Sequence, residues 1–155
     1  MKHTLETLLP LLDSPEGLEK LRILTAEADG WSRKANKWGQ PVILTPKGNE
    51  LWHYDDRGNS YGPATTWNCS ITKARLPNYP TSLDAIFAAE ERIGLHNKEI
   101  WDCQDTWFGY AEDVYHALDG DFPDPWEHAF MTPARRCIPY ILTAQEIREA
   151  GKDAE

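Results

Sequence analysis

The sequence predicts an α+β fold, in which a small mixed or antiparallel sheet packs with helices in an α/β/α sandwich. Apolar residues recur at helical spacing towards both ends of the chain. Short runs rich in β-branched and aromatic residues, bounded by glycine, proline and asparagine, fill the middle. With 155 residues, 41% of them hydrophobic, the chain can bury one core. We therefore expect a single domain at 1–150 and a frayed tail at 151–155.

The N-terminal part is predicted to contain two helices. Leucines recur at helical spacing over 5–12, and Pro10 should end or kink that first helix because it lacks an N–H group. Ser14 followed by Pro15 is typical of a helix start, with serine at the N-cap and proline at the first helical position. Gly30 is the expected stop of the second helix.

The middle of the chain is predicted to form the sheet. Residues 31–40 are polar, basic and contain tryptophan, which indicates a loop. Three runs then have the composition of short strands, at 41–45, 50–54 and 65–72.

The downstream half returns to helix. Thr81 stands three residues before Asp84, which resembles a capping box, and Gly94 should end this helix. The remaining segments are predicted to be a helix at 105–118, a loop at 119–128 and a closing helix after Thr132-Pro133.

Charge and composition exclude several function classes. The net charge of −9 argues against binding of long nucleic acids or an anionic membrane surface. No apolar run approaches the ~20 residues of a membrane span, and the first residues do not resemble a signal peptide. Three widely spaced cysteines indicate a reducing compartment, so we expect a cytoplasmic protein.

The segment 31–80 differs from the rest of the chain in charge. It holds seven basic and three acidic residues and is therefore +4 within the −9 chain. One interpretation is a solvated basic face on an acidic protein. The other is a local site for a small anion, which the acidic remainder shields from long polyanions.

Residues 58–62 match the G-x-S-x-G pattern of serine hydrolases, with Ser60 at the nucleophile position. That motif needs an apolar strand before the serine and a helix after it, whereas Asp55, Asp56 and Arg57 precede it and Pro63 follows. The composition favours a hairpin turn. We therefore expect no catalytic residue and no enzyme activity.

Metal and cofactor motifs are also missing from the sequence. The five histidines never form H-x-x-x-H or H-E-x-x-H, and no cysteine pair has zinc-ligand spacing. The acidic run with Asp119, Asp121 and Asp124 has Pro123 where a calcium loop needs an oxygen ligand. Neither a Walker A motif nor G-x-G-x-x-G occurs. We expect no metal and no cofactor.

Aromatic and basic residues in the middle segment are the candidate ligand site. Trp52 and Tyr54 share one face of their predicted strand, and basic residues follow the next predicted strand. Aromatic rings for stacking beside cations suit a nucleotide. The alternative is that Trp52 and Trp67 are core residues. The predicted ligand-binding set is Arg33, Lys34, Trp52, Tyr54, Lys73, Arg75 and Tyr79.

Two stretches resemble the phage ABA sandwich family of small phage-encoded proteins: "LPNYPTSLDAIFAAEERIG" (76–94) and, later, "FMTPARRCIPYIL" (130–142). The resemblance covers residues 67–142. The shared features are helix-capping residues and the apolar positions that helices bury in the core. The chain departs from the pattern at Pro139 and at the long loop 119–128, which leaves the course of the C-terminal half open.

The resemblance implies a phage accessory protein of the host cytoplasm and supplies no catalytic residues. By analogy, the chain is similar to anti-defence sponges, which are oligomers that sequester cyclic di- or trinucleotide immune signals without cleaving them. We accordingly expect a homo-oligomer. The alternative is an interaction module that inhibits a host or phage protein through exposed tryptophans. A small nucleotide-cleaving enzyme ranks last.

Overall fold

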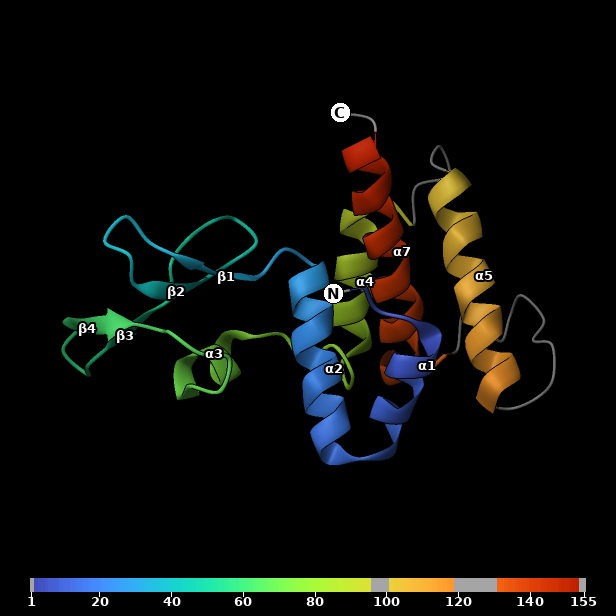
Figure 1. Ribbon diagram of the computed structural model, residues 1–155. Coiled ribbons are helices and arrows are strands. Elements are labelled where there is room, and N and C mark those ends of the chain that lie inside the picture. The colour runs from blue at the N-terminus through green and yellow to red at the C-terminus, as the bar shows by residue number, and fades with distance from the viewer. Residues whose placement is uncertain (1, 96–100, 119–130, 154–155) are drawn as a thin grey trace. The chain divides into compact units, whose positions relative to one another are not determined.

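The computed structural model describes residues 2–95, 101–118 and 131–153 (Figure 1). Helices combine with two antiparallel two-stranded sheets, which confirms the predicted α+β class. The strands form these two sheets rather than one. The chain divides into two compact units: a helical unit, Met1–Ala28 with Asn78–Glu155, and a strand unit, Asp29–Pro77. The α/β/α layering and the single domain at 1–150 stay predictions.

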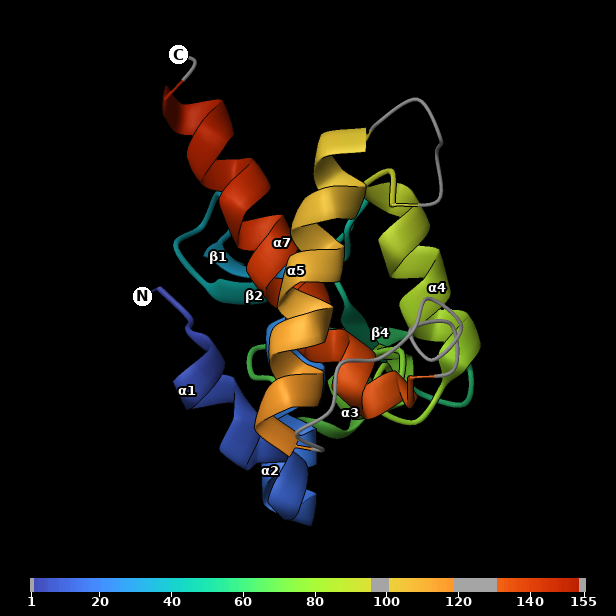
Figure 2. The same cartoon turned by 90° about the vertical axis from the view of Figure 1, so that its right-hand side faces the viewer.

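The helical unit is organised around its last helix. α7 packs against α1, α2, α4 and α5, and α5 runs alongside it (Figures 1 and 2). Fully buried side chains come from several of these helices, such as Leu21 from α2, Ile86 from α4 and Ile138 from α7, whereas η1 has no buried residue. The elements are α1 (Leu5–Leu8), the 3-10 helix η1 (Leu9–Asp13), α2 (Pro15–Ala28), α4 (Leu83–Arg92), α5 (Trp101–Leu118) and α7 (Pro133–Asp153).

The helix signals in the sequence are confirmed at both ends of this unit. Pro10 lies in η1, where the first α-helix changes to 3-10 geometry. The Ser14 hydroxyl accepts a hydrogen bond of 3.0 Å from the N–H of Gly17 and caps α2. In the same way, the Thr132 hydroxyl accepts one of 3.3 Å from the N–H of Arg135 at the start of α7.

Two predictions about the later helices need correction, and one question that the sequence left open is answered. The N-cap of α4 is Ser82, not Thr81, because the Ser82 hydroxyl accepts the N–H of Ala85 at 3.2 Å. Residues 151–153, which were expected to belong to the C-terminal tail, are the last residues of α7. Pro139 lies inside α7 without ending the helix, and the surrounding buried residues hold it there. The predicted loop 119–128 lies outside the described residues.

The strand unit consists of two hairpins followed by a short helix. β1 (Ser32–Ala35) pairs with β2 (Pro41–Leu44), and β3 (Trp52–Tyr54) pairs with β4 (Ser60–Pro63). The predicted strands at 41–45 and 50–54 are confirmed, and α3 is Ser70–Arg75.

The predicted loop at 31–40 is wrong for residues 32–35, and the predicted strand at 65–72 is wrong. Residues 32–35 form β1, whose mostly exposed side chains need no apolar alternation because β1 is held by its backbone pairing to β2. Residues 70–75 form α3, in which the β-branched Thr72 is fully buried. Burial therefore outweighs the β-propensity of this segment.

Three turns of the strand unit share one construction. The side-chain oxygens of Asn36, Thr45 and Asp55 each accept the N–H of the residue four positions later. Three positions after each of these residues comes a glycine with positive φ: Gly39, Gly48 and Gly58. The polar cap and the left-handed glycine together close each turn. The side chains between cap and glycine are thereby held at the tips of the turns.

Candidate functional site

The structure places six of the seven predicted ligand-binding residues in the strand unit and Tyr79 in the helical unit. Tyr79 is fully buried. Its ring is therefore covered by protein and offers no stacking surface. We correct the predicted set by removing Tyr79 from it.

Arg33 and Lys34 are both exposed on β1. Because successive residues of a strand point to opposite faces, these two cations flank the β1–β2 hairpin on different sides. The Nε of Arg33 donates a 2.7 Å hydrogen bond to the carbonyl of Thr65, which fixes the arginine along the unit. Lys34 makes no such contact with a described residue.

The aromatic residues of β3 differ in exposure. Trp52 is half-buried and its indole Nε1 donates to Oε2 of Glu50 at 3.0 Å. Tyr54 is 56% exposed. Trp67, for which core burial was the alternative, is half-buried. Tyr54 is therefore the predicted aromatic residue whose ring is most open to a ligand.

Lys73 and Arg75 lie in the last turn of α3 rather than beyond the end of a strand, which corrects their predicted setting. Both are exposed. Cations near the C-terminal end of a helix interact favourably with its dipole, so this position suits them. Two residues apart on a helix, they point in different directions.

The sequence-based reasoning missed Lys37 and Trp38, at the tip of the first turn. Trp38 is 66% exposed, and the Nζ of Lys37 lies 4.4 Å from the centroid of its ring. The Asn36 side chain accepts the backbone N–H of Trp38 at 2.9 Å and so fixes the turn beneath it. A tryptophan next to the asparagine and glycine of a polar turn was the signal available in the sequence.

All seven lysine and arginine residues of the strand unit are exposed. With four acidic residues, this unit is +3, whereas the rest of the chain is −12. Six of these cations form no ion pair with any described residue: Arg33, Lys34, Lys37, Lys47, Arg57 and Arg75. The unit therefore presents uncompensated positive charge next to exposed aromatic rings.

Ser60 begins β4 directly after the Asp55–Asn59 turn, and the next helix starts only at Ser70. The hairpin interpretation of G-x-S-x-G is confirmed, because β3 and β4 pair on either side of this turn. Among the described residues, no cluster of three or more His, Cys, Asp or Glu side chains could hold a metal ion.

Cys69 is the N-cap of α3, and its Sγ lies 2.9 Å from Oγ1 of Thr72. Partial burial alone would raise the pKa of this thiol, but hydrogen bonds from the Thr72 side chain and nearby backbone N–H groups outweigh it and lower the pKa. By contrast, burial raises the pKa of Cys137 to about 12. The two thiols thus differ in their availability as thiolates.

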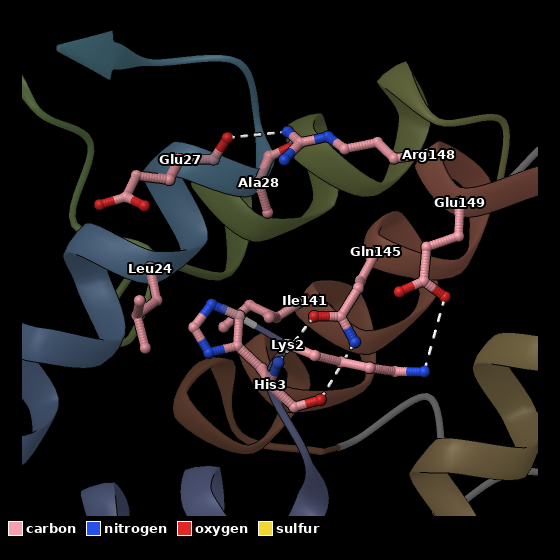
Figure 3. A pocket seen from close by; sticks show the side chains of 9 residues that line it. All are labelled: Lys2, His3, Leu24, Glu27, Ala28, Ile141, Gln145, Arg148 and Glu149. Atoms are coloured by element: carbon pink, nitrogen blue, oxygen red, sulfur yellow. Dashed lines mark hydrogen bonds and ion pairs between the residues drawn. The ribbon is translucent and has the colours of Figure 1, made fainter. Parts of the chain in front are cut away.

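The helical unit contains a cavity of about 360 Å³ that sequence-based reasoning did not find. It lies between the N-terminal residues Lys2 and His3, the last turns of α2 and α7 from Ile141 to Glu149 (Figure 3). His3 and Gln145 close one side: the His3 N–H donates to Oε1 of Gln145 at 2.7 Å, and Nε2 of Gln145 donates to the His3 carbonyl at 3.0 Å. Because its lining comes from distant segments, no local motif marks it.

Comparisons of the chain with models of protein families, with curated proteins and with solved structures found no match. Within the described ranges, no helix combines the length and the apolar character that crossing a membrane requires.

Proposed function

We propose that this protein is a non-catalytic binding protein that sequesters a small anionic ligand on its strand unit. The observation that carries the proposal is the set of seven exposed cations in Asp29–Pro77, six of which have no ion pair with a described residue. Charge-assisted hydrogen bonds from such groups to phosphate oxygens are among the stronger polar contacts in proteins. The negative charge of the rest of the chain disfavours long polyanions.

A cyclic di- or trinucleotide is our first candidate for the ligand. Such a molecule presents bases for stacking and phosphates for cations. Trp38 and Tyr54 are the two exposed aromatic side chains of the strand unit's described residues, and Lys37 lies against the Trp38 ring. The resemblance to phage ABA sandwich proteins adds the biological setting, in which a phage protein evades host immunity in the host cytoplasm.

The ligand would be held between copies of the chain. A two-fold axis would offer matching cations and rings to the two halves of a cyclic dinucleotide, and burial between chains slows release. We therefore propose a homo-oligomer, and light scattering at micromolar concentration tests it. A 17.7 kDa particle with and without ligand would contradict this arrangement.

The deciding experiment incubates the full chain with a panel of cyclic di- and trinucleotides and follows the thermal midpoint. We expect one nucleotide to raise the midpoint and to be recovered intact after heating. Recovery of a cleaved product would show an enzyme instead. A panel in which no nucleotide changes the midpoint would contradict nucleotide binding.

A protein-interaction module is the second candidate, and a specific observation favours it. Trp38 is 66% exposed at the tip of a fixed turn, and aromatic anchors of this kind dominate many protein interfaces. Trp31 and Trp107 are buried and Trp52 and Trp67 are half-buried, so Trp38 is the described tryptophan most open to a partner. Pull-down from host lysate with wild type and Trp38→Ala tests it, because loss of a specific partner only in the variant would support the interaction module.

A further inference from the structure

The lining of the cavity in the helical unit includes a guanidinium and a carboxylate that form no ion pair with each other. Nη2 of Arg148 donates to the main-chain carbonyls of Glu27 and Ala28, at 2.8 and 2.9 Å. The arginine thus caps the C-terminal end of α2, where a cation is favourable. Its other N–H groups make no bond to a described residue.

The Glu27 side chain has no direct partner in the part of the chain that the structure describes. Its carboxylate forms neither a hydrogen bond nor an ion pair there. Partial burial raises the pKa of Glu27, although the charges of His3 and Arg148 oppose that shift. A cation placed against this carboxylate would offset the cost of its desolvation.

The remaining surface of the cavity includes an aliphatic patch. Leu24 and Ala28 of α2 and Ile141 of α7 line it (Figure 3). The Lys2–Glu149 ion pair, at 3.6 Å, is largely exposed. Those two charges therefore compensate each other, and Glu27 and Arg148 remain, beside the His3 imidazole, as the ionisable groups of the lining.

We propose that this cavity binds a free aliphatic α-amino acid. The ammonium group meets the carboxylate of Glu27, the carboxylate group meets the guanidinium of Arg148, and the side chain covers Leu24 and Ile141. An α-amino acid carries two opposite charges, which matches an acidic and a basic group that line one cavity. A ligand with only one of these charges would lose one of the two charge-assisted contacts. The cavity volume lies near the lower end of the range for small-molecule sites.

Isothermal titration calorimetry of the full chain tests the proposal with L-leucine and two truncated analogues, 3-methylbutylamine and 4-methylpentanoate. We expect L-leucine to bind and each analogue to bind at least tenfold more weakly, because each lacks one charge-assisted contact. Absence of leucine binding at concentrations on the order of 10 mM, or equal affinity for either analogue, would overturn the proposal.

Glu27→Gln is the matching variant, because the Glu27 carboxylate makes no hydrogen bond or ion pair with a described residue. It should weaken leucine binding at least tenfold, whereas Glu16→Gln, an exposed change on the same helix, should not alter it. Leu24→Phe should also reduce binding by filling the aliphatic part. If Glu27→Gln bound L-leucine as tightly as the wild type, Glu27 would not contact the ammonium group and the proposal would be wrong. None of these outcomes depends on nucleotide binding, since all nine lining residues belong to the helical unit.

Discussion

The guanidinium of Arg136 on α7 and the carboxylate of Glu90 on α4 form a two-point ion pair inside the helical unit. Nη2 of Arg136 lies 2.7 Å from Oε1 of Glu90, and Nε lies 3.2 Å from Oε2. Both side chains are almost completely buried. The guanidinium also lies over the rings of Phe87 and Trp107, 4.6 and 4.8 Å from their centroids. One side chain of α7 thereby connects α4 and α5 through charge and aromatic contact.

Breaking this pair should strongly destabilise the protein. Glu90→Gln leaves a buried guanidinium without its counter-charge, and we expect a loss of about 3–5 kcal/mol in the free energy of unfolding. Chemical denaturation measures it. Glu91→Gln, at the exposed neighbouring position, should change stability by less than about 0.5 kcal/mol. The double change Glu90→Leu with Arg136→Met should be more stable than either single change. If Glu90→Leu and Arg136→Met each had a negligible effect on stability, the ion pair would not be formed in solution.

Two helical glycines should respond in opposite ways to alanine. A Cβ at Gly17 would lie 2.3 Å from the carbonyl oxygen of Leu11, so Gly17→Ala should destabilise by about 1–3 kcal/mol through overpacking. Nothing lies within 4 Å of a Cβ at Gly109, an exposed position within α5. There, alanine should stabilise by about 0.5–1 kcal/mol because it restricts the unfolded chain and favours helix. Thermal or urea unfolding measures the stability of both variants. If both substitutions changed the free energy of unfolding in the same direction, the close contact between η1 and α2 would be contradicted.

Cys69 should react with iodoacetamide much faster than Cys137 at neutral pH. The pKa of Cys69 lies below its ordinary value, whereas burial raises that of Cys137 to about 12. At a given pH, the thiol with the lower pKa contains more thiolate, which is the reactive form. Thr72→Ser keeps a hydroxyl and should preserve the difference, while Thr72→Val should slow Cys69 and move its pH profile upward. Peptide mapping by mass spectrometry separates the two sites, and similar rates would refute the assignment.

The ligand site on the strand unit should be sensitive to single charges. Arg75→Ala should weaken binding of the nucleotide identified by the thermal panel by about 1.5–3 kcal/mol, the value of a charge-assisted hydrogen bond. The midpoint without ligand should barely change, because Arg75 is exposed and makes no ion pair with a described residue. Lys20→Ala, an exposed change on α2, controls for net charge. If both variants weakened nucleotide binding equally, the overall charge of the protein, and not a specific site, would account for the effect.

Local signals in the sequence were sufficient for most helix boundaries. Ser14 and Thr132 cap the helices that they were predicted to cap, and Gly94 stands just beyond the end of α4. Such caps satisfy backbone N–H groups within a few residues, so they depend little on distant contacts. The same reasoning placed the hairpin at Asp55–Asn59.

Predictions failed where a distant partner decides the structure. β1 exists because its backbone pairs with β2, although its side chains lack the alternation of a half-buried strand. Residues 70–75 are helical despite their β-branched composition, and Thr72 is fully buried. Secondary structure in such segments follows from pairing and burial, which a local pattern does not contain.

The sequence by itself determined the α+β class, the helix caps, the turn chemistry and the concentration of basic residues in the middle of the chain. Tertiary structure alone decided which of these residues are accessible: it buries Tyr79, leaves Trp38 66% exposed and pairs Glu90 with Arg136. It also assembled the cavity between the N-terminal residues, α2 and α7. Caps and turns are set by neighbours along the chain, whereas burial and cavities arise from segments that meet only when the chain has folded.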